Sequence, residues 1–287
     1  MKYVEPLFRP PAEADSLIFQ AAYGCPHNTC RFCGMYKTVK YRVRDRDELL
    51  REIAEAGRKY PETQRIFLAD GDVMIFPFAE LREILSELNR HFPLLSRVNI
   101  YANGSSIIAK TPEELQELRR LKLNTLYVGL ESGDQEILEW VNKQEKVQDM
   151  IAGVRLAQEC GLKCSVMILL GLGGRQYSSR HAAKTAEALN AMQPRLLSAL
   201  RFIEVPGCSM YDTYQTITEY GAVEELKEII SRLELHKTVF RANHTSNPVP
   251  LAGRFPGDKQ RLIAELDYLL SGRMLDRKGP GRQPFFL

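Results

Sequence analysis

Three cysteines lie close together in the stretch GCPHNTCRFCG. Cys25 and Cys30 are separated by four residues, and Cys30 and Cys33 by two. Three thiolates at this spacing can hold one corner of a [4Fe-4S] cluster, because a short loop can curl round the metal and present all three sulfurs. Such a cluster ordinarily takes four cysteine ligands. Three ligands would leave one iron open to another molecule.

A zinc site is the alternative for the same loop. His27 lies between the first two cysteines and would complete a tetrahedral set of ligands. Paired zinc ligands usually come from two separate knuckles, and the sequence offers no second knuckle. The spacing therefore favours an iron–sulfur cluster over zinc.

Six short apolar runs, rich in β-branched and aromatic residues, are the elements that would position this loop. They read as buried strands and cover residues 16–23, 65–69, 97–102, 125–130, 164–172 and 196–205. Segments with helical periodicity lie between them, and one begins at Thr111-Pro112-Glu113-Glu114, a capping box with proline in the first turn. Strands alternating with helices predict a parallel α/β sheet, either open and doubly wound or curled into a barrel.

The alternation ends after Val205. Residues 224–235 and 257–270 are predicted helices, separated by an irregular stretch over 240–256. Six strands are fewer than the eight that close a full barrel, so we expect this C-terminal part to cover an open side.

Polar residues follow several of the predicted strands, at the edge where ligands bind in parallel α/β folds. The motifs are Asp70-Gly71-Asp72, Asn103-Gly104-Ser105, Glu131-Ser132, the glycine segment from Gly171, and Glu204 to Tyr211 with Cys208. Asp-Gly and Asn-Gly are also ordinary turn signals, and Ser132 or Asp134 is also a candidate helix cap. Capping does not explain a glutamate that ends an apolar strand.

Taken together, these motifs resemble those of the radical S-adenosylmethionine (radical SAM) superfamily. Members carry three cysteines after the first strand of a partial (β/α)6 barrel of the TIM type. The resemblance covers residues 16–211. The commonest spacing in the superfamily has three residues between the first two cysteines, whereas this chain has four between Cys25 and Cys30. It implies a partial barrel over 16–211, an N-terminal extension over 1–15, and a mainly helical extension over 212–287.

The resemblance also implies the cofactors and their ligands. Cys25, Cys30 and Cys33 would bind a [4Fe-4S] cluster whose open iron is chelated by S-adenosylmethionine. One electron would then cleave the cofactor, in most members to methionine and a 5′-deoxyadenosyl radical that abstracts hydrogen. The residues implied to contact the cofactor are Phe32, Tyr36, Asp70, Gly71, Asp72, Asn103, Glu131, Ser132 and Gly171.

Three further residues are predicted on the substrate side. Cys208 could donate a hydrogen atom, Tyr211 would approach the substrate, and His244 is a candidate acid or base if its segment folds over the barrel mouth. A buried free cysteine and a solvated loop histidine are the alternatives. Cys160 and Cys164 fall at the opposite end of the predicted barrel, so we expect one cluster and structural roles for these two.

Composition limits the partners. A net charge of +3, with basic residues dispersed along the chain, does not demand a nucleic acid. No apolar run is long enough to span a bilayer, and the first residues lack the apolar core of a signal peptide. We expect a cytoplasmic, oxygen-sensitive enzyme that acts on a small organic molecule and takes electrons from a flavodoxin- or ferredoxin-like protein. The rival hypothesis is a non-catalytic iron–sulfur electron carrier or redox sensor on the same barrel.

Overall fold

Parallel strands form the first of the two units into which the chain folds. The computed structural model describes residues 3–282. The first unit holds the described residues up to Thr29, with Cys33–Val128 and Ala152–Cys164. The second holds Cys30–Phe32, Gly129–Ile151 and the described residues from Ser165 onward.

The first unit is built on strands in the order β1-β4-β5-β6, all parallel. Its strands are β1 (Leu17–Gln20), β4 (Arg65–Ala69), β5 (Arg97–Ala102) and β6 (Leu123–Glu131), with a separate antiparallel pair β2 (Ala22–Tyr23) and β3 (Arg42–Val43). From Ile66 to Ala69, β4 is wholly buried, as expected of a parallel strand covered on both faces. The last three residues of β6 belong to the second unit.

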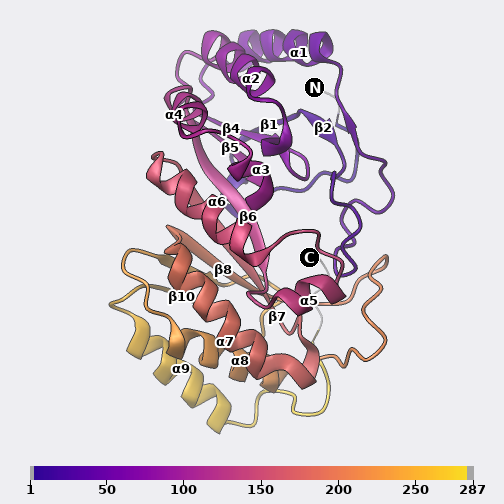
Figure 1. Ribbon diagram of the computed structural model, residues 1–287, viewed down its shortest axis with the longest axis vertical. Coiled ribbons are helices and arrows are strands. Elements are labelled where there is room, and N and C mark those ends of the chain that lie inside the picture. Colours follow the sequence, from indigo (N-terminus) through magenta and orange to yellow (C-terminus); the bar gives the residue numbers. More distant parts are fainter. Residues whose placement is uncertain (1–2, 283–287) are drawn as a thin grey trace. The chain divides into compact units, whose positions relative to one another are not determined.

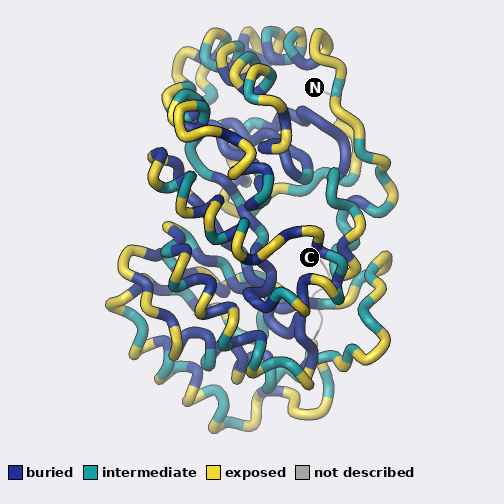
Figure 2. The backbone as a smooth tube through the Cα atoms, in the orientation of Figure 1, coloured by how far each residue is buried: buried dark blue, intermediate teal, exposed yellow. Residues whose placement is uncertain are grey.

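Helices cover this sheet (Figure 1). They are η1 (Pro11–Glu13), α1 (Arg46–Lys59), η2 (Val73–Ile75), α2 (Phe78–His91), α3 (Gly104–Ile108) and α4 (Pro112–Arg120). The predicted capping box is confirmed, because the Thr111 side chain accepts from the Glu114 backbone N–H and Glu114 bonds back to Thr111. Figure 2 shows exposed outer turns on α1 and α2 and a buried sheet inside them.

The second unit continues the pattern with β7 (Lys163–Leu170), β8 (Leu196–Arg201), β9 (Val239–Ala242) and β10 (Leu251–Arg254). β8 pairs in parallel with both β7 and β9, and β10 is antiparallel to β9. The helices are α5 (Gln135–Trp140), α7 (Gly174–Met192), α8 (Glu219–Arg232) and α9 (Lys259–Ser271), with α8 packed between α7 and α9 (Figure 1). α6 (Val147–Glu159) has residues in both units.

All six predicted strands are present, but the prediction of an irregular stretch over 240–256 was wrong. β9 and β10 form an antiparallel pair there, because Phe240 and Ala242 alternate with exposed residues and face the core, as do Leu251 and Gly253. The run over 16–23 is also divided at Ala21 into β1 and β2, and the last strand ends at Arg201 rather than at residue 205.

Candidate cofactor site

The turn after β4 lies directly against the cysteine loop of the first unit. The backbone N–H of Gly71 donates to the carbonyl of Gly24 at 3.2 Å. A Cβ atom at Gly71 would lie 2.5 Å from Cys25 Cα and 2.7 Å from its Sγ. Only glycine fits this approach, so the turn and the first cysteine are tightly packed together.

Asp72 joins the ends of neighbouring strands through its buried carboxylate. Its Oδ2 lies 3.1 Å from His27 Nε2 and accepts from Asn103 Nδ2 at 3.3 Å. Its Oδ1 accepts from Ser106 Oγ at 3.1 Å. The structure thus brings together the cysteine loop, the turn after β4 and the residue that follows β5, as the sequence predicts for one edge of a parallel sheet.

Asp70 faces away from Asp72, toward buried polar partners. Its carboxylate accepts from Gln20 Nε2 at 3.0 Å and from the Tyr36 hydroxyl at 3.2 Å. Burial raises the pKa of Asp70 to about 6, and these two hydrogen bonds oppose that rise. Tyr36 is itself buried, with Phe8 packed edge-on at 5.4 Å between ring centroids. Its predicted contact with adenine stays a prediction.

The three loop cysteines are divided between the units, Cys25 and Cys33 in the first and Cys30 in the second. Cys30 is buried and the other two are partly exposed. Within residues 3–282, no group of three or more histidine, cysteine or acidic side chains is close enough to hold a metal ion. The predicted metal ligands therefore remain a proposal.

The predicted structural roles of the other two cysteines fit their positions in the first unit. Cys160 Sγ donates to the Pro112 carbonyl and Cys164 Sγ to the Val154 carbonyl. Both residues are buried, and burial raises the pKa of Cys164 to about 12. Thiols held protonated in this way are inert.

Glu131, at the end of β6, carries an incompletely satisfied charge. The residue is 5% exposed, and its Oε1 lies 3.8 Å from Lys143 Nζ. Its Oε2 is buried without a hydrogen-bond partner in the part of the chain that the structure describes. Burial raises the pKa of the Glu131 carboxyl, and Lys143 opposes this. A buried carboxylate oxygen without a donor calls for a ligand that supplies one.

The backbone at Glu131 is also unusual, with φ at 62°. Left-handed φ in a residue with a long side chain is strained and is often found at functional sites. The neighbouring Ser132 is fully buried, and its Oγ accepts from the Asp134 backbone N–H, while Asp134 caps α5. Asp134 thus fulfils the capping alternative, and the contact of Ser132 with a cofactor stays a prediction.

The glycine segment after β7 turns at Gly171, where φ is 81°. The Gly171 carbonyl accepts from the Tyr214 hydroxyl, and the Gly173 carbonyl accepts from the Tyr211 hydroxyl, both at 3.0 Å. Burial raises the pKa of Tyr211 to about 12. Tyr211 is therefore a neutral donor that is tied to the glycine turn.

Phe32 and Cys208 meet in the second unit. Cys208 Sγ lies 3.0 Å from the Phe32 carbonyl, to which it donates, and Phe32 packs against a buried cluster that includes Leu172. The Ser209 N–H also donates to the Arg31 carbonyl. The segment after β8 thus lies against the part of the cysteine loop that belongs to this unit.

His244 follows β9 and is partly buried. Its Nδ1 accepts from the Ser246 backbone N–H at 3.2 Å and lies 2.8 Å from Ser246 Oγ. Burial lowers the pKa of His244. A neutral imidazole suits a base, but these local contacts do not tie it to Cys208 or Tyr211, so its role stays a prediction.

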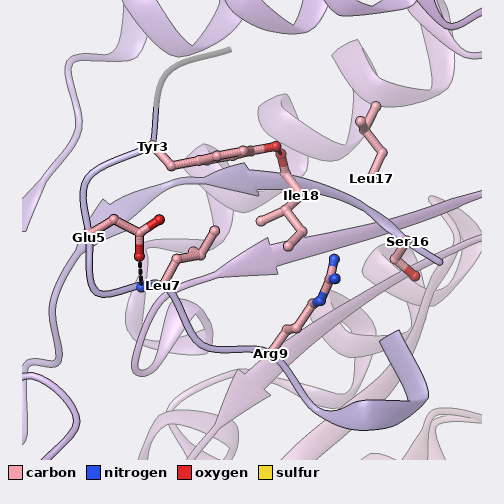
Figure 3. A pocket seen from close by; sticks show the side chains of 7 residues that line it. All are labelled: Tyr3, Glu5, Leu7, Arg9, Ser16, Leu17 and Ile18. Atoms are coloured by element: carbon pink, nitrogen blue, oxygen red, sulfur yellow. Dashed lines mark hydrogen bonds between the residues drawn. The ribbon is translucent and has the colours of Figure 1, made fainter. Parts of the chain in front are cut away.

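A hollow of about 330 Å³ lies elsewhere, at the start of β1 (Figure 3). It is lined by Tyr3, Glu5, Leu7, Arg9, Ser16, Leu17 and Ile18. Residues of the segment before β1 line it together with the first two residues of that strand, and none of them is among the predicted cofactor contacts. We therefore keep this hollow apart from the candidate site.

Sequence reasoning missed two buried residues beside the site, His181 on α7 and Glu225 on α8. His181 Nδ1 lies 3.0 Å from Glu225 Oε1, and Glu225 Oε1 accepts from the Gly171 N–H at 2.7 Å. Both residues sit within ordinary helical patterns, and they are 44 positions apart. No local signal in the sequence predicts such a pair.

Comparison with known families settles the superfamily. Residues 20–183, more than half of the 287-residue chain, match the family model of the radical SAM superfamily. The chain belongs to the radical SAM superfamily. It is accordingly an enzyme of this superfamily, and radical SAM membership implies iron–sulfur binding and S-adenosylmethionine.

Known radical SAM structures are similar in fold. Coproporphyrinogen III oxidase (HemN) from Escherichia coli, described as a radical SAM enzyme, matches with a TM-score of 0.61 and 19% identity over 75% of this chain and 51% of its own. Methylornithine synthase (PylB) matches with a TM-score of 0.53 and 13% identity over 88% and 81%. These likenesses confirm the predicted fold class, a mostly parallel α/β sheet similar to radical SAM partial barrels.

A curated relative is the heme chaperone HemW of Bacillus subtilis, 23% identical over 226 residues. The match covers 74% of this chain and 58% of HemW, so the chain spans little more than half of that relative. In the described part of the chain, no helix has the length and apolar character to cross a membrane.

Within each unit, the residues described above fit the radical SAM cofactors. The ribose of S-adenosylmethionine carries two hydroxyl donors, which suit the partnerless Oε2 of Glu131. The backbone of Gly71 packs so closely against Cys25 that no side chain fits between the turn after β4 and the cysteine loop. Three cysteines are the ligand number that leaves one iron open.

Proposed function

We propose that this protein cleaves S-adenosylmethionine reductively and uses the products to abstract hydrogen from a small organic substrate. When bound, the cluster and S-adenosylmethionine supply this chemistry, one electron releasing methionine and a 5′-deoxyadenosyl radical. The observation that carries the proposal is the buried Glu131 Oε2, whose missing donor a ribose hydroxyl would provide.

The chain's own residues would bind and orient these groups. Cys25, Cys30 and Cys33 would hold the [4Fe-4S] cluster. Gly71 keeps the turn after β4 against Cys25, and Asp72 holds this turn to His27 and Asn103. Because Asp72 already pairs with His27 and Asn103, we propose that it positions the turn, whose backbone carbonyls would receive the amino group of the cofactor.

The second unit would bind the rest of the cofactor. Glu131 would accept from the ribose, and the segment at Gly171 would line the adenine, close to Phe32, which packs near Leu172. Cys208 and Tyr211 would face the substrate, with His244 as a base. The electron would come from a flavodoxin- or ferredoxin-like donor.

The test is anaerobic reconstitution with iron and sulfide, followed by dithionite and S-adenosylmethionine. We expect 5′-deoxyadenosine and methionine, detected by chromatography. Cys30→Ala should abolish both cluster binding and cleavage, whereas Cys164→Ala, which changes a buried cysteine away from the loop, should retain both. A cluster that changes colour on reduction without releasing either product would instead support an electron carrier, and uptake of zinc in preference to iron would refute the proposal.

A further inference from the structure

The buried pair formed by His181 and Glu225 connects two helices of the second unit. Both side chains are 0% exposed, and they meet at 3.0 Å between Nδ1 and Oε1. α7 contributes the histidine and α8 the glutamate, and the two helices lie side by side (Figure 1). Glu225 lies beyond the segment 20–183 that matches the superfamily.

The remaining contacts of the pair reach two backbone turns. His181 Nε2 lies 3.4 Å from the Glu131 carbonyl. Glu225 Oε1 accepts from the Gly171 N–H at 2.7 Å, and its Oε2 accepts from Ser178 Oγ at 2.5 Å. Both ring nitrogens of His181 face acceptors, an arrangement that suits a doubly protonated imidazolium paired with a carboxylate.

The two turns share a left-handed backbone, with φ at 62° in Glu131 and 81° in Gly171. Glycine adopts this conformation freely, but a glutamate is strained in it. Strained residues persist where their surroundings hold them in place. The hydrogen bond from His181 to the Glu131 carbonyl is such a restraint, and it fixes the direction in which the Glu131 side chain leaves the backbone.

A buried ion pair is a weak source of stability, because removing two charges from water costs about as much as their attraction returns. Well-packed apolar side chains would join α7 to α8 as firmly. The pair instead fixes the orientation of two backbone turns. The Glu225 carboxylate accepts from the Gly171 amide and also orients the His181 ring, which contacts the Glu131 carbonyl.

We propose that Glu225 and His181 are positioning residues that couple the ribose-binding and adenine-binding turns of the cofactor site. This inference rests on the proposed function, because it takes Glu131 and Gly171 as cofactor contacts. Under this proposal, α8 contributes to the binding of S-adenosylmethionine, although it lies outside the segment 20–183 that matches the superfamily. Neither residue would touch the reacting atoms.

The experiment measures equilibrium binding of S-adenosylmethionine to the oxidised, cluster-loaded protein by anaerobic calorimetry, with no turnover. Glu225→Gln keeps the shape and an acceptor for Gly171 but removes the charge that keeps His181 doubly protonated, so one bond of His181 is lost. We expect the dissociation constant to rise about tenfold or more, as when an outer-shell partner of a site is removed, with unchanged iron content. The double variant Glu225→Gln/His181→Gln buries no lone charge and serves if the single variant does not fold.

Asn190→Ala is the matched control. Asn190 also ties α7 to the end of α8, through the Arg232 carbonyl and the Glu234 N–H, without touching either turn. It should lower the unfolding midpoint and leave the dissociation constant unchanged. Binding that is within about twofold of wild type in Glu225→Gln and the double variant, or that weakens equally in Asn190→Ala, would overturn the inference. If wild type binds but does not cleave the cofactor, the proposed reaction fails and the positioning role stands; if it does not bind, both fail.

Discussion

At the scale of single residues, Glu131 has the most to gain from a ligand. One carboxylate oxygen faces Lys143 at 3.8 Å, and the other has no donor among the described residues. Leaving a buried charged acceptor unsatisfied costs about 1–3 kcal/mol or more. A ribose hydroxyl would recover that energy on binding, which makes Glu131 a source of affinity for the cofactor.

Glu131→Gln tests this assignment. A neutral amide accepts a weaker hydrogen bond, and we expect the loss of about 1.5–3 kcal/mol of binding energy, or a roughly 10- to 150-fold higher dissociation constant for S-adenosylmethionine. Anaerobic calorimetry measures it, and iron content shows that the cluster is retained. Affinity equal to that of wild type would contradict a role for Glu131 in binding.

The pH dependence of stability tests the imidazolium. Burial is the largest single influence and lowers the pKa of His181, but Glu225, the Glu131 carbonyl and Asp134 together raise it more, so that the pKa stands above its ordinary value of 6.5. A raised histidine pKa stabilises the fold below the unfolded value, and this stability is lost as pH rises through the folded value. The free energy of unfolding of wild type should therefore fall above pH 6.5.

The measurement compares denaturant unfolding of wild type and the double variant Glu225→Gln/His181→Gln between pH 6 and 9. This variant lacks the titrating ring and leaves no lone buried carboxylate, so its free energy of unfolding should depend less on pH over this range. Parallel curves for the two proteins would show that His181 is not an imidazolium in the fold.

What the sequence predicted at this scale depends on distance along the chain. Glu131 is recognisable because a glutamate ends an apolar strand, and Gly71 because it lies between two aspartates after a strand. No local sequence pattern distinguishes His181 and Glu225, because their role depends on a contact between residues 44 positions apart. The sequence placed Asn103 at the same sheet edge as Asp72, but no local pattern predicted that Asp72 would bond to His27 and Asn103.

At the scale of elements, the turn after β4 depends on the absence of a side chain. Gly71→Ala places a methyl group 2.5 Å from Cys25 Cα. Forcing a methyl group into packed surroundings costs about 1–3 kcal/mol, and here the strain falls on the cysteine loop. We expect lower iron content after reconstitution and a lower unfolding midpoint.

Gly257→Ala is the control for this variant. The added Cβ would meet its nearest atom, the Arg254 carbonyl oxygen, only at 4.0 Å. Iron content and midpoint should stay at the wild-type values. If Gly71→Ala binds iron as well as Gly257→Ala does, the close packing of turn and loop has no role in holding the cluster.

Elements were predicted best where a single pattern dominates. The strands β4 to β8 are apolar runs, and α4 has its capping box, so hydrophobicity and caps sufficed. β9 and β10 were not predicted, because each strand has only four residues and the segment that joins them, residues 243–250, is polar and rich in proline. β9 is stabilised by pairing with β8, whose residues lie 43 positions earlier in the chain. Because this pairing is distant in sequence, no local pattern predicts it.

At the scale of the whole molecule, the segment that matches the superfamily stops short of a complete core. The match ends at residue 183, within α7. α8 then buries Val223, Leu226, Ile229 and Ile230, and β9 pairs along β8. Each of these four side chains contributes about 1.5–3 kcal/mol when buried, and together they rival the whole net stability of a domain, about 5–15 kcal/mol.

A chain that ends at residue 211, the predicted limit of the barrel, should therefore fail to fold. Without residues 212–287, β8 loses its partner β9, and α7 exposes the apolar side chains that α8 covers. We expect aggregation or no cooperative transition by circular dichroism. A chain that ends at residue 275 keeps α8, β9, β10 and α9 and should unfold cooperatively, at a lower midpoint because Arg201 loses its bonds to the Pro280 and Arg282 carbonyls. Cooperative unfolding of the shorter chain would show instead that residues 212–287 are an addition to an independent domain.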